Sequence, residues 1–188
     1  ADPAAIHAAR EKVKAGIGKS LAGLLERLAA PGRAGAYSPD PAQAGARALR
    51  FAALGLIAAA EPGRGAKLAL EAFRAASSMS EEMGALAVLT LIDAPERRTG
   101  LDEFHAKHRA DHLLIDKWLA LEAMGPFPST VGEVERLLAH PDFKIGTPNK
   151  VHALIGTFSS LNPVAFNAPG GEGYRLLADV IGRIDPLN

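Results

Sequence analysis

The stretch that decides the fold is "LLIDKWLALEAM", Leu113–Met124. Its apolar side chains Leu114, Trp118 and Leu121 recur at the spacing that places them on one face of an α-helix. Similar spacing recurs along nearly the whole chain, and no stretch alternates apolar and polar residues with β-branched enrichment. We therefore expect an all-α chain of about nine helices, stacked as antiparallel neighbours in an α-α superhelix or solenoid. No exact repeat period is found, so a regular repeat family is not expected.

Cap and breaker residues divide the first half of the chain. Asp2 and Pro3 suit the N-cap and first position of a helix. Ser80 is the expected N-cap of the fourth helix, which lacks a capping-box glutamate because position 83 is Met83. Proline and glycine content predicts a loop over Ala30–Pro41. The inward-facing stripe of the first helix is expected to be Ile6, Val13, Ile17, Leu21, Leu24 and Leu28.

Cap and breaker residues also divide the second half of the chain. Two helices are expected over Pro95–Arg109 and Ala110–Met124, unless they form one continuous helix. Thr130 and Glu133 have the spacing of a capping box, and Thr147, which precedes a proline, is the expected cap of a later helix. The inward face of the last helix is expected to be Tyr174, Leu177, Ile181 and Ile184.

Composition limits the classes of partner. The 188 residues are 48% hydrophobic, which suits a single helical domain over residues 1–188. The 21 basic and 21 acidic residues give a formal net charge of zero, and no basic run occurs, so neither a nucleic-acid nor a membrane partner is expected. The chain has no cysteine and no evident signal peptide, and a cytoplasmic location is the expectation.

A histidine cluster, "HAKHRADH" (His105–His112), is the most conspicuous candidate for chemistry. On one helix, His105, His108 and His112 would share a face, and the last two have the spacing of zinc-binding helices. However, no histidine is followed by glutamate, so the HExxH motif is absent. The outer two would also lie about 10 Å apart along the axis and away from the core stripe. We expect a solvated face, no metal ligand and no cofactor in this chain.

Other candidate motifs favour structural roles. "GKS" (Gly18–Ser20) lacks the first glycine of a phosphate-binding loop, and "PGGEGY" (Pro169–Tyr174) is interpreted as a turn that leads into a helix. Adjacent residues do not share a helical face, so Asp116 and Lys117 are expected to have separate structural roles. Trp118, the only tryptophan, is expected in the core. No catalytic residue is predicted.

The opening stretch also resembles the "LVxDKWF" signature of bacterial aminopeptidase N, a family of gluzincin-type zinc aminopeptidases. Further segments resemble the C-terminal helical domain of that family in the same order, from "DPAAIHAAREKVKAGIGKSL" (Asp2–Leu21) through Arg47–Ala60 and Ala76–Leu89. The last is "HPDFKIGTPNKVHALIGTFSSLNPVAFNAPGGEGYRLLADVI" (His140–Ile181), which is similar to the family's "NPN[RK]-x-R-x-LIG" and "NP-x-x-FH" motifs. The resemblance covers nearly the whole chain.

The resemblance implies a noncatalytic part of a larger enzyme. The parent would be a zinc-dependent exopeptidase that removes N-terminal residues from peptides, with its HExxH and GxMEN motifs in an upstream catalytic domain. Neither motif occurs here, so this chain should be inactive alone. Its expected partners are that catalytic domain and, through the full-length enzyme, peptide substrates. The helical domain is expected to enclose the active-site chamber and to restrict access to it.

The resemblance also implies three substrate-chamber residues, Asn149, Lys150 and His152. His152 stands where the family usually has arginine, so a shorter, titratable imidazole replaces the fixed guanidinium fork. Asn167 stands where the family has histidine. Two other functions remain open: a stand-alone α-helical scaffold that binds a peptide or protein in a concave groove, and a metalloprotein built on the histidine cluster.

Overall fold

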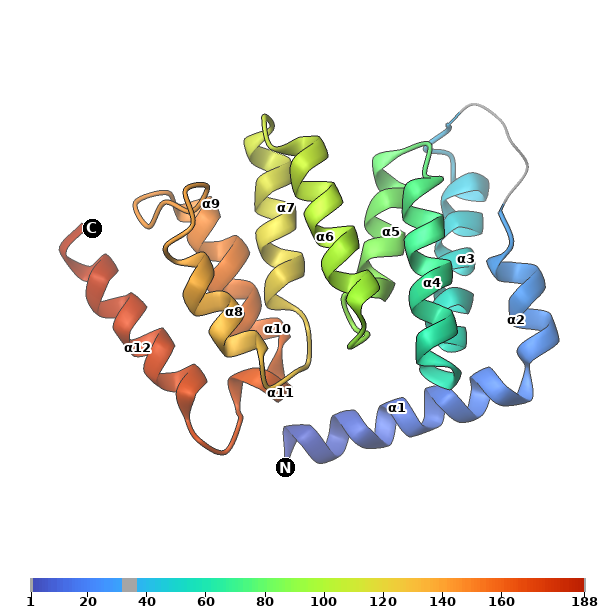
Figure 1. Ribbon diagram of the computed structural model, residues 1–188, viewed down its shortest axis with the longest axis horizontal. Coiled ribbons are helices and arrows are strands. Elements are labelled where there is room, and N and C mark those ends of the chain that lie inside the picture. Colours follow the sequence, from blue (N-terminus) through green and yellow to red (C-terminus); the bar gives the residue numbers. More distant parts are fainter. Residues whose placement is uncertain (1, 32–36, 188) are drawn as a thin grey trace. The chain divides into compact units, whose positions relative to one another are not determined.

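The computed structural model describes residues 2–31 and 37–187, and every regular element in those ranges is helical (Figure 1). The prediction of an all-α chain is therefore confirmed. Contacts divide the chain into two units: His7–Gly100, and Ala1–Ile6 together with Leu101–Asn188. The one-domain interpretation stays a prediction. None of the helices in these ranges combines the length and apolarity needed to cross a bilayer.

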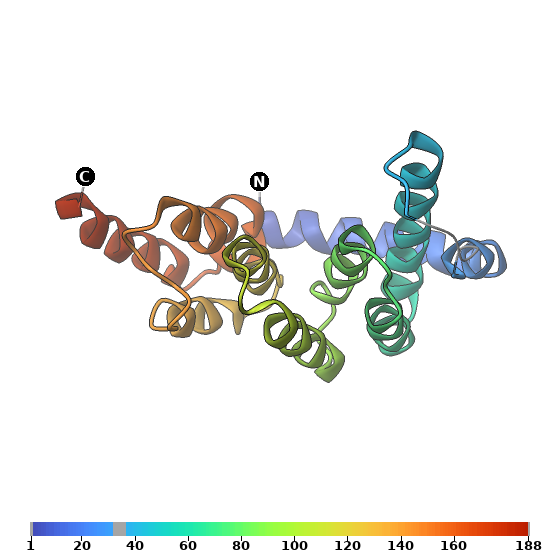
Figure 2. The same cartoon turned by 90° about the horizontal axis from the view of Figure 1, so that it is seen from above.

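The unit over His7–Gly100 is built on three helices that pack side by side. They are α3 (Pro41–Ala60), α4 (Pro62–Arg74) and α5 (Met79–Leu89), and they alternate in direction (Figures 1 and 2). Their shared core includes Leu54, Ile57, Leu70, Phe73, Leu86 and Leu89. A Cβ atom at Gly65 would lie 2.3 Å from the Cα atom of Ala58, so glycine allows the backbones of α4 and α3 to meet.

The first predicted helix is two helices, α1 (Pro3–Ser20) and α2 (Ala22–Ala29). Leu21 separates them because its backbone (φ −113°, ψ 20°) leaves the helical region. The cap at Asp2 is confirmed, since its carboxylate accepts from the Ala4 amide over 2.9 Å. Of the predicted inward stripe, Leu28 is half-buried against the core cluster that contains Leu25. The prediction is wrong for the other five residues, which are exposed: Ile6, Val13, Ile17, Leu21 and Leu24. The predicted loop Ala30–Pro41 includes 32–36, which lie outside the described residues.

The residue that caps α5 differs from the predicted one. Ser78, not Ser80, precedes the helix, and its hydroxyl accepts from the Glu81 amide. Glu81 reaches back to accept from the amide and hydroxyl of Ser77, both over 2.8 Å. Burial alone would raise the pKa of Glu81, but the hydrogen bonds from Ser77 and the charge of Arg50 outweigh it and lower the pKa. The expectation that this helix lacks a capping glutamate is therefore wrong, because Glu81 has that role once the cap is Ser78.

The unit that contains Leu101–Asn188 begins within α6 (Pro95–His108) and continues through α7 (His112–Ala123) and α8 (Thr130–Leu137). Then follow α9 (Pro148–Val151), a π-helical segment (His152–Gly156), α10 (Thr157–Leu161), α11 (Pro163–Phe166), α12 (Glu172–Ile184) and a 3₁₀ turn (Asp185–Leu187). Along this part of the chain α7, α8 and the α9–α10 segment alternate in direction (Figure 1). The buried side chains of this unit include Phe104 on α6 and, on the segments that follow, Leu119, Val134, Leu154 and Phe158.

The question of one or two helices before Met124 is settled by a cap. Asp111 lies between α6 and α7, and its carboxylate accepts from the amides of Leu113 and Leu114. Because α7 begins anew there, the three clustered histidines are not on a single straight helix.

Two further predictions in this unit are wrong. Thr130 does not cap α8; its hydroxyl is buried and donates to the carbonyl of Gly125 over 2.6 Å. On α12 the buried face is Leu176 and Val180, and the predicted inward residues Tyr174 and Ile181 are more than half exposed. The other two predicted residues, Leu177 and Ile184, are half-buried, and the Tyr174 ring packs on Phe166 of α11 with 4.8 Å between centroids. The described part of the chain therefore covers the predicted stripe only in part.

Candidate functional site

The three predicted chamber residues lie at the start of one helical segment. Thr147 precedes it, Pro148 is its first residue, and the α-helical path changes to a π-helix at His152. In this segment the amide of Thr157 donates to the carbonyl of His152, five residues earlier. Single π turns within α-helices are rare and frequently lie at functional sites. The turn coincides with the sequence that carries the family resemblance.

Lys150 does not offer its charge to solvent. Its residue is 9% exposed, and Nζ donates to Asp116 Oδ1 over 2.9 Å and to the His112 carbonyl over 3.4 Å. This ion pair ties the first turn of α9 to the first turns of α7. Asp116 thus has the structural role that its sequence position suggested, while the neighbouring Lys117 is exposed.

Asn149 and His152 are the two predicted chamber residues whose side chains are exposed. They flank the buried Lys150, which fixes the backbone from which they project. Their arrangement offers an amide and an imidazole, groups that both donate and accept hydrogen bonds, beside a paired charge. Their contact with a substrate stays a prediction.

A second contact joins motifs far apart in the sequence. Asn162 is 2% exposed, and its amide nitrogen donates to the carbonyls of Ala123 over 2.9 Å and Gly125 over 2.7 Å. Its side-chain oxygen accepts from the Ala165 amide, which caps α11. Asn162 therefore holds the end of α7 against the start of α11.

The three clustered histidines differ in burial. His112 is exposed, but His105 is half-buried, and its Nε2 lies 2.7 Å from Asp142 Oδ2. His108 is also half-buried and packs on Phe104 with 4.6 Å between ring centroids, so the solvated-face prediction is wrong for both His105 and His108. The His105 ring also packs on the indole of Trp118, with 4.3 Å between centroids, and Trp118 is buried as predicted.

Sequence reasoning missed the partners of His105, which are His140 and Asp142. They lie in "HPDF" (140–143), where a histidine and an aspartate two residues apart flank a proline turn. The sequence alone shows this local pattern. The sequence did not show that this pattern lies beside His105, because His105 and Asp142 are 37 residues apart.

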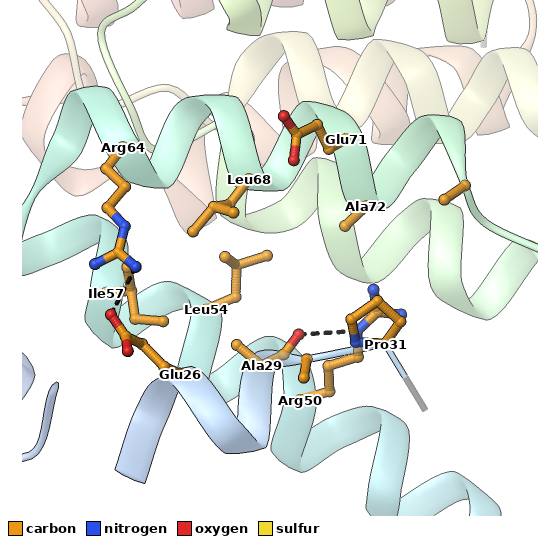
Figure 3. A pocket seen from close by; sticks show the side chains of 12 residues that line it. Glu26, Ala29, Pro31, Arg50, Leu54, Ile57, Arg64, Leu68, Glu71 and Ala72 are labelled. Atoms are coloured by element: carbon orange, nitrogen blue, oxygen red, sulfur yellow. Dashed lines mark hydrogen bonds and ion pairs between the residues drawn. The ribbon is translucent and has the colours of Figure 1, made fainter. Parts of the chain in front are cut away.

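A cavity in the unit over His7–Gly100 is the other candidate for binding (Figure 3). Its volume is about 460 Å³, and its apolar lining comes from α2, α3 and α4: Ala29, Leu54, Ile57, Leu68 and Ala72. Arg50 donates to the Ala29 carbonyl over 3.3 Å, and Arg64 pairs with Glu26 over 2.6 Å. These two arginines are thus already engaged, so the cavity offers mainly apolar contact.

Comparisons with known proteins cover the whole chain. Residues 1–188 match a family described as "Domain of unknown function (DUF3458_C) ARM repeats". The chain is 38% identical over 189 residues to aminopeptidase N of Caulobacter vibrioides, covering 100% of this chain and 22% of that protein. Aminopeptidase N of Escherichia coli is 29% identical over 187 residues, with the same coverage of 100% and 22%.

One solved structure has a similar fold. Legionella pneumophila aminopeptidase A, in complex with aspartic acid, has a TM-score of 0.84 and 28% identity, covering 95% of this chain and 22% of that chain. The ARM-repeat description corrects the expectation that no repeat family would match, because armadillo-type repeats share helix packing without an exact sequence period. It also fits the predicted solenoid-like stack of antiparallel helices.

The chain spans about a fifth of the length of the curated relatives it matches, and the match lies in their C-terminal part. The chain belongs to the DUF3458_C family of ARM-repeat helical domains, the C-terminal helical domain of bacterial aminopeptidase N.

Proposed function

We propose that this chain is a noncatalytic C-terminal part of a zinc-dependent aminopeptidase N, which releases N-terminal amino acids from peptides. In that role the helical domain encloses the active-site chamber of an upstream catalytic domain and restricts which peptides enter. The observation that carries the proposal is the match of the full chain to about a fifth of proteins named aminopeptidase N. The absence of HExxH and GxMEN from the sequence fits a role outside the chemistry. A cytoplasmic location stays a prediction.

The surface of α1 supports a partner domain. Val13 and Ile17 on α1, with Leu21 after it and Leu24 on α2, are each at least 40% exposed. Apolar side chains at helical spacing on one surface are typical of a face that packs against another protein surface. We assign this face to the upstream catalytic domain. Such packing would exclude water from the chamber and fix the width of its entrance.

Asn149 and His152 are the residues that we place on the chamber side. Each would form a hydrogen bond with the backbone of a bound peptide, since both groups can donate and accept. Lys150 is a positioning residue: its ion pair with Asp116 fixes the turn that carries both side chains. This arrangement adds uniform binding of peptides and contributes nothing to bond cleavage.

His152→Ala in the full-length enzyme is therefore expected to raise KM for a peptide roughly 2- to 10-fold with little change in kcat, because one neutral hydrogen bond is lost. Asn149→Ala should act similarly. Steady-state kinetics with a tripeptide substrate measures both effects. His112→Ala, an exposed histidine outside the proposed site, is the matched control and should leave KM unchanged. Equal kinetics for His152→Ala, Asn149→Ala and this control would remove both residues from the chamber.

The alternative, a stand-alone scaffold that binds a peptide or protein, draws support from the cavity between α2, α3 and α4. Its lining would favour an apolar segment, since the rim arginines are engaged. A gene in which this chain has its own start codon and no upstream peptidase domain would favour this alternative over the enzyme domain.

A further inference from the structure

Three potential metal ligands meet at the surface of the unit that contains Leu101–Asn188. His105 Nε2 lies 2.7 Å from Asp142 Oδ2, and His140 Nδ1 lies 3.7 Å from the same oxygen. One ligand atom from each residue can be chosen so that all lie within 4.8 Å of one another. His105 comes from α6, and the other two come from the connection after α8.

The two distances to Asp142 Oδ2 are close to those of a zinc site. In a tetrahedral site with bonds of about 2.0–2.1 Å, ligand atoms lie about 3.3 Å apart. The distance from His105 to Asp142 is shorter than this value and that from His140 to Asp142 is longer. The nitrogens of the two histidines lie within 4.8 Å of each other, so the two rings would move closer together to hold one ion. His140 Nδ1 accepts a hydrogen bond from the Asp142 amide over 3.2 Å. That nitrogen is therefore the unprotonated one, and an ion bound to it would replace the hydrogen bond from the Asp142 amide.

The two imidazoles are held in place before any ion arrives. Trp118, which is 4% exposed, packs against His105 and against His140, with 4.3 Å and 5.2 Å between ring centroids. Support of this kind orients ligands and raises metal affinity. The side chains of the three ligands are 25%, 29% and 34% exposed, so an ion can enter and a water can complete its coordination.

We infer that His105, His140 and Asp142 form a binding site for one divalent transition-metal ion of the zinc class. Two imidazoles and one carboxylate suit Zn²⁺, Co²⁺ or Ni²⁺, whereas Ca²⁺ and Mg²⁺ prefer all-oxygen sites. The ion would cross-link α6 to the connection after α8 and stabilise the folded state. This inference departs from the sequence-based expectation of no metal ligand. It is also independent of the proposed function, whose catalytic zinc belongs to an upstream domain.

The 188-residue chain, prepared without a histidine tag, is the material for the test. Trp118 is its only tryptophan and lies against both imidazoles, so its fluorescence reports on this site. Titration with Co²⁺ or Ni²⁺ is expected to quench that fluorescence to saturation. Calorimetry with Zn²⁺ is expected to give one ion per chain, and the thermal midpoint should rise with zinc concentration.

Substitutions of single residues test where the ion binds. Asp142→Asn, which keeps the shape and removes the charge, and His140→Ala are each expected to weaken Zn²⁺ binding at least about 10-fold. His112→Ala removes an exposed histidine and should bind as the parent chain does. Far-UV circular dichroism checks that each variant is folded, and Asp142→Asn keeps the test decisive if His140→Ala is not. Absence of saturable binding, or binding that survives in Asp142→Asn, would overturn the inference and leave the proposed function untouched.

Discussion

Replacing Asp116 with alanine is expected to lower the free energy of unfolding of the Leu101–Asn188 unit by about 2–4 kcal/mol. The side chains of Lys150 and Asp116 are 11% and 18% exposed, so the substitution leaves an ammonium group largely buried. Its remaining neighbour is the His112 carbonyl at 3.4 Å, which cannot balance a full charge. Urea unfolding followed by the fluorescence of Trp118, which lies in this unit, measures the loss.

Two controls separate the buried pair from an ordinary surface charge. Glu172→Ala breaks an exposed pair with Arg175 on α12, in the same unit as Trp118, and should cost less than about 1 kcal/mol. The double variant Asp116→Leu/Lys150→Met removes both charges, and it should recover much of the stability lost in Asp116→Ala. A loss in Asp116→Ala no larger than in Glu172→Ala would show that the pair does not hold α9 against α7.

Replacing Asn162 with alanine is expected to cost about 2–4 kcal/mol, because one buried side chain serves three backbone groups. The Ala123 carbonyl would lose a buried donor, while the Gly125 carbonyl would keep the Thr130 hydroxyl. The Ala165 amide would lose the acceptor that caps α11. The same urea titration measures this change.

Asn162→Asp is the sharper variant. It keeps the cap acceptor but turns a donor into a carboxylate oxygen that faces two carbonyls, so it should destabilise at least as much as Asn162→Ala. Asn167→Ala is the matched control, because its side chain donates to the Pro163 carbonyl and accepts from the Tyr174 hydroxyl at the surface. A variant Asn162→Asp as stable as the parent would contradict the donor role.

The helical class could be predicted because apolar spacing is a local property, and so could the helix starts after Asp2 and Thr147, which each precede a proline. For Thr147, only the position was predicted correctly, because its side chain makes no cap hydrogen bond. The cap of α5 was misplaced because three serines compete at 77–80, and the choice depends on where the chain turns. Thr130 was misassigned because its hydroxyl meets Gly125, a partner outside the capping pattern.

The apolar stripes on α1 and α12 were misassigned for a different reason. Val13 and Ile17 on α1, and Tyr174 and Ile181 on α12, have the spacing of a packed face but are exposed. Periodicity shows that a face is suited to be covered and carries no information about which segment covers it. In a chain that spans about a fifth of its relatives, a stripe assigned to the internal core can belong to an interface instead.

Among the site residues, sequence reasoning reached the α9 turn only through resemblance to a family. Helical spacing relates residues three or four apart, whereas Lys150 meets Asp116 across 34 positions and His105 meets Asp142 across 37. Such pairs depend on how helices pack. The burial of Lys150 was therefore not predictable, although its neighbours Asn149 and His152 are exposed.

The measurement that tests the central claim most directly is hydrolysis of an aminoacyl-aminocoumarin substrate by this 188-residue chain and by the full-length polypeptide, both supplied with Zn²⁺. The account predicts that the full-length polypeptide releases the fluorophore and that the chain alone stays at the rate of a mock-purified control. Zinc bound at His105, His140 and Asp142 would not alter that result. Release by the chain alone, well above the control, would contradict a noncatalytic role.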